Sequence, residues 1–272
     1  MKSVSQQDLI NRKAWRSWGA KRWFRIIEDW TDPGEAAAIG LIADKVHGTP
    51  VLDVGVGGGR TVPLLSKLSD DYEAIDYMPE MVEICQRRYP GVRVRRMDAR
   101  DLSAFDDNDF GLVMFSFNGI DAVDYAGRRA ILREFARVLR PGGSLVFSTH
   151  NMHGPSYREN LTQFLKLPAF SRDPLKLGFN IARAVINLPL ATINYIRNSR
   201  MNREFDGYAI HVCAAHKFGI VIVYIDMEAQ LRELEELGFT IDAVFGNLGE
   251  EALHPGDNVD KVNWFHFVAH KT

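Results

Sequence analysis

Residues 51–61 read Val51-Leu52-Asp53-Val54-Gly55-Val56-Gly57-Gly58-Gly59-Arg60-Thr61. In this stretch a short apolar strand runs into a loop with four glycines, and a helical pattern follows. Because glycine has no Cβ, such a loop can turn at positive φ and approach a ligand closely, while the following helix presents free N–H groups. The stretch therefore predicts a loop that binds a nucleotide-containing cofactor.

Two kinds of cofactor are compatible with a Gly-x-Gly motif after a strand. Dinucleotide-binding proteins have the pattern Gly-x-Gly-x-x-Gly, with an acidic residue about 20 positions further on. In this chain the third glycine would fall at Arg60, and an acid that the dinucleotide pattern does not require, Asp53, stands inside the strand. Both departures count against NAD, although a nicotinamide oxidoreductase stays an alternative.

Five segments within residues 51–150 resemble, in order, the motifs of the class I S-adenosylmethionine-dependent methyltransferases. They are 51–59, with Leu-Asp before Gly-x-Gly-x-Gly, 74–81 (Ala-Ile-Asp-Tyr-Met-Pro-Glu-Met), 96–102 (Arg-Met-Asp-Ala-Arg-Asp-Leu), 110–118 (Phe-Gly-Leu-Val-Met-Phe-Ser-Phe-Asn) and 139–147 (Leu-Arg-Pro-Gly-Gly-Ser-Leu-Val-Phe). The fourth segment has Phe-Gly where the family usually has Phe-Asp. A weaker resemblance covers 226–270, so the family implies nothing about the segment between.

The resemblance implies S-adenosylmethionine as the cofactor. In the family the acid that ends the second strand, here Asp76, binds the ribose diol, and Asp98 and Ala99 take the position that meets the adenine. Asp53 is placed to contact the methionine ammonium group. The other implied cofactor contacts are Gly55, Gly57, Gly59, Tyr77, Met81 and Phe115.

Each of the three acids also has a plainer interpretation. A carboxylate at the carboxyl end of a strand, such as Asp76, can take both hydroxyls of a ribose. Asp76 could instead be an acid at a helix N-terminus. Asp53 could be a turn acid held by neighbouring backbone N–H groups, and Asp98 could be a loop acid paired with a neighbouring arginine.

Strands are predicted over 50–54, 72–76, 92–96, 111–116, 144–149, 239–245 and 264–270, and the first five alternate with helical patterns. This order predicts an α/β fold with a doubly wound, mostly parallel seven-stranded sheet, the Rossmann-like methyltransferase fold, whose last strand is antiparallel as in the family. One helix has an apolar face from Ile131 to Leu139 and is stopped by 141–143. Another begins near Asp226 and ends at Gly238.

We expect a single domain over residues 1–272. Residues 1–48 are predicted to form an N-terminal helical cap and 49–150 the cofactor-binding core. Residues 151–225 would be a lid or substrate insertion, and 226–272 the C-terminal helix and the last two strands. In small-molecule methyltransferases of this fold, an N-terminal helix commonly closes over the cofactor and an insertion after the fifth strand closes over the acceptor.

Composition is that of an ordinary globular protein, with 46% hydrophobic residues among 272 and a net charge of −2. Two cysteines cannot build a disulfide framework, and the N-terminus lacks the apolar core of a signal peptide, so we expect a cytoplasmic location. The most apolar stretch, 174–196, is interrupted by charged and amide side chains. It is therefore not predicted to cross a membrane, and it is a candidate contact in a homodimer.

Charge is unevenly distributed along the chain. Residues 151–225 carry 9 basic and 4 acidic side chains, whereas 226–272 carry 3 basic and 10 acidic ones. The basic insertion is either a solvated surface or a pocket for an anionic group of a small-molecule acceptor. Arginines also cluster over 87–100, and an RNA methyltransferase would use such groups on phosphates. A sequence pI of about 6.5 and the lack of a recognised RNA-binding module argue against nucleic acid.

Aromatic and aliphatic side chains crowd the N-terminal segment at spacings that partly fit one helical face. They are Trp15, Trp18, Trp23, Phe24, Ile27 and Trp30. Such a stripe is more often part of a core. Closing over the cofactor is the functional alternative, because methyl transfer is an in-line displacement that gains from alignment and from exclusion of water.

A general base is needed only if the acceptor is a hydroxyl or a protonated amine. His150 is the first candidate, because it follows the fifth strand, where carboxyl-end loops face the ligand crevice, and imidazole titrates near working pH. A histidine that only caps the strand end is the alternative. The candidate acceptor contacts are Asn118, Asn151, Tyr157, Tyr208 and His211. No metal is predicted, because His150-x-x-His153 has no further ligand at zinc spacing.

These observations predict methyl transfer from S-adenosylmethionine to an oxygen or nitrogen of a small molecule within a closed pocket. An RNA methyltransferase, a nicotinamide oxidoreductase and a non-catalytic protein that keeps the cofactor fold are the alternatives.

Overall fold

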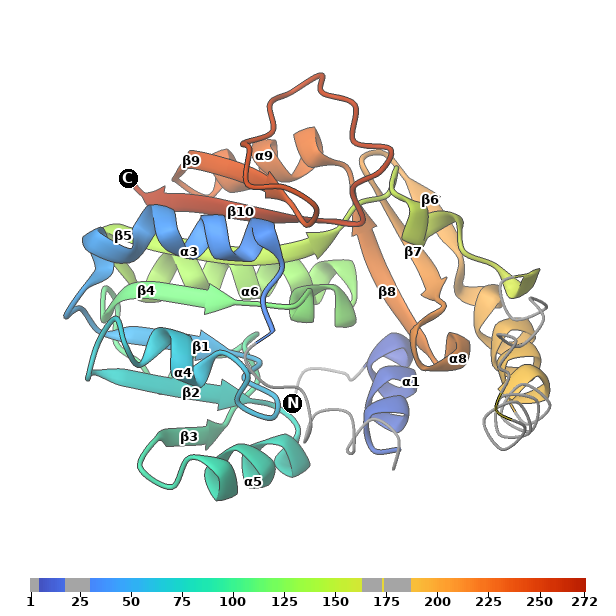
Figure 1. The fold of residues 1–272 in the computed structure, drawn as a ribbon, viewed down its shortest axis with the longest axis horizontal. Helices are drawn as coiled ribbons and strands as arrows, with labels where there is room; N and C mark the ends of the chain where they lie inside the picture. Colours follow the sequence, from blue (N-terminus) through green and yellow to red (C-terminus); the bar gives the residue numbers. More distant parts are fainter. Residues whose placement is uncertain (1–4, 18–29, 163–172, 174–186) are drawn as a thin grey trace.

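The centre of the computed structural model, which describes residues 5–17, 30–162, 173 and 187–272, is a seven-stranded sheet in the order β3-β2-β1-β4-β5-β10-β9 (Figure 1). The strands are β1 (Val51–Val54), β2 (Tyr72–Asp76), β3 (Arg93–Arg96), β4 (Phe110–Phe115), β5 (Leu139–His150), β9 (Phe239–Gly246) and β10 (Trp264–Lys271). The first five pair in parallel, whereas β10 is antiparallel to both β5 and β9. The predicted doubly wound, mostly parallel sheet is confirmed.

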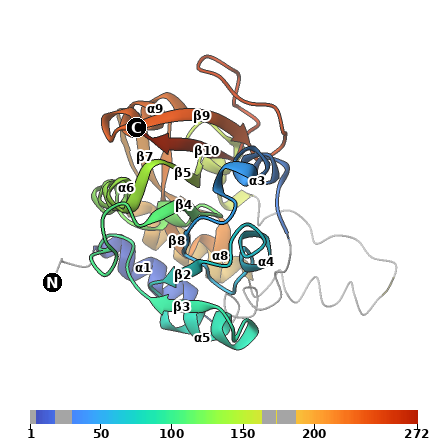
Figure 2. The same cartoon turned by 90° about the vertical axis from the view of Figure 1, so that its left-hand side faces the viewer.

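Helices cover both faces of this sheet. On one face lie α3 (Pro33–Val46), α4 (Val62–Leu65) and α5 (Pro79–Arg88), and on the other lie α6 (Tyr125–Val138) and α9 (Met227–Glu236) (Figures 1 and 2). Each face has its own buried cluster. Ile42, Leu65 and Cys85 belong to the first, and Ile131 and Leu234 to the second. Burial of these two apolar layers is the main force that holds the three layers together.

One predicted boundary differs from the structure. The turn residues 141–143 were expected to stop the helix, but α6 ends earlier, at Val138. Leu139 has extended backbone angles and already pairs with Phe110 of β4, so it begins β5. The turn residues 141–143 form an irregularity in that strand, at which the pairing register with β4 shifts. The predicted start of α9 is confirmed, because the Asp226 side chain accepts a hydrogen bond from the Ala229 N–H at 3.0 Å.

A second sheet occupies part of the segment between β5 and α9, where no strand was predicted. It consists of β6 (Arg203–Phe205), β7 (Tyr208–Cys213) and β8 (Ile220–Ile225), all antiparallel. All six residues of β8 are buried, and such a short apolar run carries no periodicity that identifies a strand. Residues 187–198 are helical, and α8 (Ala215–Phe218) precedes β8. Most of the candidate dimer contact at 174–196 lies outside the described residues.

The N-terminal helix α1 (Gln6–Trp15) joins this small sheet to the main one. Asn11, which is fully buried, donates to the carbonyls of Ala122 and Val221 at 2.7 Å and accepts from the Val221 N–H at 2.9 Å. Ala122 belongs to the short helix η1 (Gly119–Ala122) after β4, and Val221 lies in β8. As a result, α1 and the small sheet lie at the end of the main sheet toward which the parallel strands point (Figure 1). Of the aromatic stripe, Trp15 and Trp30 are described, and the other members lie outside the described residues.

The close approach of α3 to β9 depends on Gly34. A Cβ at Gly34 would lie 2.2 Å from the backbone oxygen of Gly246, which cannot swing away as a side chain can. We expect Gly34→Ala to lower the free energy of unfolding by about 1–3 kcal/mol or more, as overpacking does. Gly40→Ala in the same helix is the matched control. No heavy atom lies within 4 Å of its added Cβ, and it should raise stability by about 0.5–1 kcal/mol. Urea unfolding of both variants tests this, and equal effects would contradict the packing argument.

Candidate active site

The glycine loop follows β1 as predicted. Gly55, Gly57 and Gly59 have φ values of 65°, 54° and 87°. A Cβ at Gly55 would lie 2.4 Å from the ring of Phe115, the last residue of β4. Phe115, predicted as a cofactor contact, is buried, and its ring packs against the loop at Gly55. The loop is therefore supported by the core, and its backbone is held in a conformation that favours glycine.

Asp76 ends β2 beside this loop. Its two carboxylate oxygens accept hydrogen bonds from the backbone N–H groups of Gly57, at 3.0 Å, and Met78, at 2.8 Å. Burial raises the pKa of Asp76 to about 6, although these two hydrogen bonds oppose the rise. A carboxylate offers about four lone-pair positions, so two acceptor positions remain for a ligand.

Asp53 lies inside β1 and is buried. Its Oδ2 accepts hydrogen bonds from the hydroxyls of Thr61, at 2.5 Å, and Tyr72, at 2.7 Å. Burial raises the pKa of Asp53 to about 6, and the two hydroxyl hydrogen bonds oppose the rise. The partners are side chains, not the backbone N–H groups of a turn, and they tie the carboxylate to the start of α4 and to β2.

Residues at the predicted adenine end lie against α1. Asp98 forms a two-pronged ion pair with Arg100, at 2.9 and 2.6 Å, and Arg100 also contacts Asp8 of α1 at 2.6 Å. Burial would raise the pKa of Asp98, but the hydrogen bonds and charge of Arg100 outweigh it and hold the pKa below its usual value. Asp98 is thus paired with a neighbouring arginine, as its plainer interpretation states.

Tyr77 and Met81 pack in one cluster with Trp15 of α1. The Tyr77 ring meets the Trp15 ring edge to face at 5.8 Å, and the Arg12 guanidinium lies 5.0 Å from it. Burial raises the pKa of Tyr77. Met81 packs in the same small cluster, whereas Ala99 packs in the core cluster beneath α6 and α9. The N-terminal helix therefore covers Tyr77 and the loop that carries Asp98.

A buried ion pair beside the glycine loop was missed in the sequence. Arg60 donates to both carboxylate oxygens of Glu35 at 2.7 Å, to the Trp30 carbonyl at 2.5 Å and to the Ser116 hydroxyl at 2.5 Å. Its guanidinium also lies 5.5 Å from the ring centre of Phe117. Arg60 therefore connects the start of α3, through Glu35, with the residue that follows β4, Ser116.

The chain turns abruptly after β4. Phe117 and Asn118 are consecutive non-glycine residues with positive φ, 55° and 58°, a conformation that costs free energy and occurs preferentially at functional sites. The Asn118 N–H donates to the Ser148 hydroxyl at 2.7 Å. The Asn118 side chain is buried, yet its Oδ1 has no hydrogen-bond partner among the described residues. An acceptor atom of this kind is suited to a ligand N–H or O–H.

His150 ends β5 and is paired with an acid that the sequence did not single out. Asp121, in η1, accepts at Oδ2 from the His150 backbone N–H at 2.7 Å and lies 2.9 Å from His150 Nδ1. Its Oδ1 accepts from Arg128 Nη1 at 2.5 Å and from the Thr149 hydroxyl at 2.6 Å. Asp121 and Arg128 have no solvent exposure, whereas the His150 side chain is 17% exposed. The structure therefore contains, at the carboxyl end of β5, a pair of a partly exposed histidine and a fully buried aspartate.

Aromatic side chains surround His150. Its ring lies 5.4 Å from Tyr224 and 6.2 Å from Trp264, and Tyr224 in turn contacts Tyr157 at 5.2 Å. His211 contacts Tyr157 at 5.1 Å. Burial lowers the pKa of His211 and raises that of Tyr157. Two of the candidate acceptor contacts, Tyr157 and His211, are thus brought together near His150.

The other two candidates in this segment have different surroundings. Tyr208 stacks on Tyr125 at 3.7 Å and on Phe205 at 4.6 Å, which places it beside the start of α6. Asn151 is fully buried, and its amide donates to the carbonyls of Val259 and Val262, both at 2.9 Å. The side-chain oxygen Oδ1 of Asn151 accepts from the His153 N–H at 2.8 Å. Asn151 therefore holds the loop before β10 in place and is not exposed to a substrate.

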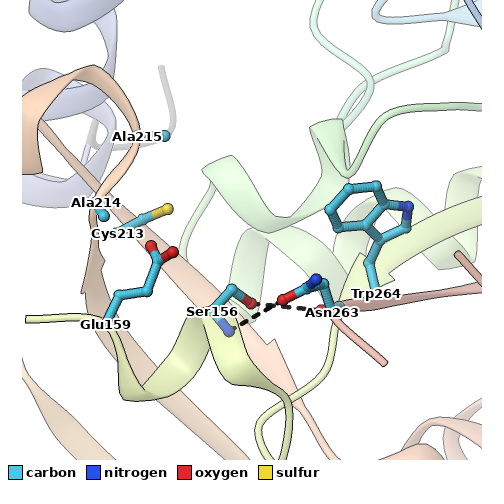
Figure 3. Close-up of a pocket in the computed structure, with 7 residues that line it drawn as sticks. All are labelled: Ser156, Glu159, Cys213, Ala214, Ala215, Asn263 and Trp264. Atoms are coloured by element: carbon cyan, nitrogen blue, oxygen red, sulfur yellow. Dashed lines mark hydrogen bonds between the residues drawn. The ribbon is translucent and has the colours of Figure 1, made fainter. Parts of the chain in front are cut away.

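A pocket of about 520 Å³ opens on the side of Trp264 (Figure 3). Figure 3 shows Trp264 on one side and Cys213, at the end of β7, on the other with Glu159. Ser156 and Asn263, which are hydrogen-bonded to each other, lie between them. The lining residues are Ser156, Glu159, Cys213, Ala214, Ala215, Asn263 and Trp264. Burial raises the pKa of the Cys213 thiol to about 11, so the thiol is protonated at neutral pH. Because Trp264 contacts His150, the pocket and the histidine–aspartate pair share a wall.

A search of the described residues for groups of three or more histidine, cysteine or acidic side chains that could hold a metal ion finds none. Within the same parts of the chain, no helix has the length and apolar character needed to span a membrane.

Residues 51–143 match a family model described as a methyltransferase domain. Among curated proteins, the chain is 34% identical over 112 residues to a ubiquinone biosynthesis O-methyltransferase of Xanthomonas euvesicatoria. The matched region is 39% of this chain and 45% of that protein. The chain is also 36% identical over 110 residues to a demethylmenaquinone methyltransferase of Clavibacter sepedonicus. This matched region is 38% of this chain and 43% of that protein. The match thus spans less than half the length of either relative.

Solved structures share the fold over nearly the whole chain. A 1,6-didemethyltoxoflavin-N1-methyltransferase of Burkholderia thailandensis, solved with 1,6-didemethyltoxoflavin and S-adenosylhomocysteine, has a TM-score of 0.59 at 14% identity and covers 100% of this chain and 92% of that one. An S-adenosylmethionine-dependent methyltransferase of Mesorhizobium loti has a TM-score of 0.52 at 17% identity and covers 86% and 98%. Residues 51–143 thus match a methyltransferase domain, and the glycine loop and the seven-stranded sheet form the fold of the S-adenosylmethionine-dependent methyltransferases.

Proposed function

We propose that this protein transfers the methyl group of S-adenosylmethionine to an oxygen or nitrogen of a small-molecule acceptor. The observation that carries the proposal is a continuous row of contacts from the cofactor loop to the pocket. Arg60, beside the glycines, lies 5.5 Å from the Phe117 ring, and Phe117 lies 6.5 Å from Trp264, which lines the pocket. In open α/β sheets, ligands bind in the crevice outside the carboxyl ends of the strands, where both ends of this row lie.

The described residues fit the cofactor. Asp76 has two free acceptor positions for the ribose hydroxyls, and the buried Oδ1 of Asn118 is open to an N–H donor at the end of β4. When bound, S-adenosylmethionine supplies a methyl group on a positively charged sulfur, which a nucleophile in line with the bond displaces. The protein's part is to align the acceptor and to exclude water.

Two parts of the chain are suited to exclude water. The N-terminal helix α1 packs over Tyr77 and Asp98, and the small sheet β6-β7-β8 lies beside the pocket. We propose that they act as the cap and the lid, as predicted for residues 1–48 and 151–225. Because Asn11 bonds to both η1 and β8, the two covers would move as one unit.

An aromatic acceptor suits the surroundings of His150, which include the rings of Tyr224 and Trp264. Flat rings favour offset or edge-to-face contacts with such side chains. The relatives' names refer to ubiquinone biosynthesis, demethylmenaquinone and 1,6-didemethyltoxoflavin, which supports a small molecule as the acceptor. An anionic group on it receives no support from the described pocket lining, which contains no lysine or arginine.

Nucleic acid is a poorer fit. Of the arginines that cluster over 87–100, Arg87, Arg93, Arg95 and Arg100 each pair with a nearby carboxylate. These carboxylates partly neutralise the arginine cluster, which weakens the electrostatic argument for an RNA methyltransferase. A homodimer through 174–196 stays a prediction.

Calorimetric titration with S-adenosylmethionine, S-adenosylhomocysteine, NAD and NADP tests the cofactor. Release of S-adenosylhomocysteine in the presence of catechol or 1,6-didemethyltoxoflavin then tests turnover. We expect micromolar binding of both sulfur compounds, and release that depends on an added aromatic acceptor. Binding to NAD or NADP alone would overturn the proposal. Tight cofactor binding without release for any member of a broad set of small acceptors would favour a non-catalytic protein.

A further inference from the structure

The geometry points to Asp121 as the residue that orients His150, so that Nε2 of His150 takes a proton from the acceptor during methyl transfer. The inference rests on the proposed function and deepens it, because it restricts the acceptor to a group that must lose a proton, an O–H or a protonated N–H. In this scheme His150 is the catalytic residue, and Asp121 is a positioning residue.

The hydrogen bonds around Asp121 decide which nitrogen of His150 carries the proton. Oδ1 of Asp121 accepts from Arg128 and Thr149, and Oδ2 accepts from the His150 backbone N–H. Arg128 Nη1 lies 2.5 Å from Oδ1 and forms a buried ion pair with Asp121, and a carboxylate in such a pair can only accept hydrogen bonds. Nδ1 of His150, 2.9 Å from Oδ2, must therefore be the donor. In the neutral ring the lone pair is then on Nε2.

Nε2 is the ring nitrogen that is left for a ligand. No hydrogen bond to it occurs among the described residues, the side chain is 17% exposed, and the rings of Tyr224 and Trp264 lie 5.4 and 6.2 Å from the imidazole ring. Trp264 also lines the pocket. An acceptor that stacks beside Trp264 would thus meet an imidazole whose free lone pair is already oriented, which is the geometry that general-base catalysis needs.

An acceptor hydroxyl gives its proton to Nε2 of His150 while its oxygen forms a bond to the methyl carbon. The bond between that carbon and sulfur breaks, and its electron pair goes to sulfur, which becomes neutral. The positive charge moves to the imidazolium of His150, where the Asp121 carboxylate 2.9 Å from Nδ1 stabilises it.

A second histidine–aspartate pair nearby has the opposite arrangement and serves as the matched control. His153 uses Nε2, not Nδ1, to contact Asp226 at 3.0 Å, and its side chain is 48% exposed. It therefore presents no oriented Nε2 lone pair to the pocket. We expect His153→Gln to leave methyl transfer unchanged.

Nitrogen-15 NMR of the histidine rings in the whole protein, without any ligand, tests the orientation directly. His150→Gln identifies the His150 signals by their absence. In the wild type at a pH where the ring is neutral, we expect Nδ1 to carry the proton and Nε2 to be bare. In Asp121→Asn the preference should weaken or reverse. A wild-type ring with the proton on Nε2 would overturn the inference, whether or not the Asp121 variant folds.

Kinetics test the role of the nitrogen, with catechol or whichever acceptor the turnover screen identifies. We expect His150→Gln to lower kcat by about 100-fold or more, as loss of a general base does. Binding of S-adenosylhomocysteine should be unchanged, and the fall of the rate toward acid pH should disappear. An unchanged kcat in His150→Gln would show that His150 is not the general base and would overturn the inference. Failure of the wild type to bind S-adenosylhomocysteine would overturn the proposed function instead, while the NMR result would stand.

Discussion

Asp76→Ala is expected to weaken binding of S-adenosylmethionine by about 30- to 100-fold, which is about 2–3 kcal/mol. The variant removes a carboxylate that would accept hydrogen bonds from both ribose hydroxyls, and hydrogen bonds to charged acceptors are the strong ones. It also removes the acceptor for the Gly57 N–H, so the glycine loop loses one of its supports. Calorimetric titration with S-adenosylmethionine and S-adenosylhomocysteine measures the loss.

Asp71→Ala is the matched control for this variant. Asp71 lies immediately before β2, at the opposite end of the strand from Asp76, and its contact with Arg93 is at the surface. Pairs of this kind contribute little, so cofactor affinity should not change. Equal affinity losses in the two variants would mean that Asp76 acts through general stability and not through the cofactor.

The pH dependence of binding gives a second readout of the same residue. Burial raises the pKa of Asp76 to about 6, so the carboxyl is protonated below this pH and ionised above it. If the ionised form is the one that binds, affinity should be about tenfold lower at pH 5 than at pH 7 and level above that. The step should be reduced in Asp76→Asn. A residual step is expected from Asp53, whose pKa burial also raises to about 6.

Arg128→Met is expected to lower the free energy of unfolding by about 3–5 kcal/mol, because removal of one partner of a buried ion pair leaves the other charge uncompensated. The side chains of Arg128 and Asp121 are both fully buried. The guanidinium also donates to the Gln230 side chain of α9, so the variant loses the hydrogen bonds that link η1 to that helix through Arg128. Urea unfolding followed by circular dichroism measures the change.

Arg133→Met, also in α6, is the control. Arg133 is exposed. Its loss should cost about 0–1 kcal/mol. If Arg128→Met proves as mild as Arg133→Met, the charge of Asp121 does not depend on its ion pair with Arg128, and the argument that this pair makes Asp121 an acceptor only would be wrong.

Some features of the molecule were readable in the sequence because they depend on neighbours along the chain. The apolar run of β1 followed by glycines at positive φ, the acid at the end of β2, and the cap at Asp226 are all local patterns. The alternation of strands and helices then predicts the parallel sheet, since each parallel pairing needs a crossover between its strands. The fold therefore followed from residues 51–150 and the last two strands.

Other features depend on residues far apart in the chain, which no local pattern connects. His150 was a candidate from its place after β5, but its partner Asp121 lies 29 positions earlier, and Arg128 and Thr149 complete the network only in the folded chain. The sequence did not single out Asp121, because no local pattern relates an acid shortly after β4 to a histidine at the end of β5. The small sheet was missed because β8 is a short, fully buried run, in which apolar side chains show no period.

The sequence by itself therefore determined the sheet and the cofactor loop, because dihedral preferences, hydrophobic periodicity and strand-to-loop order act over a few residues. The tertiary structure decided which nitrogen of His150 is free, which acids are already paired and what covers the ends of the strands. These depend on side chains brought within hydrogen-bond reach by the packing of α1, η1, β5 and β8. Contacts over such separations follow from the global burial of the core, and a local pattern carries no information about them.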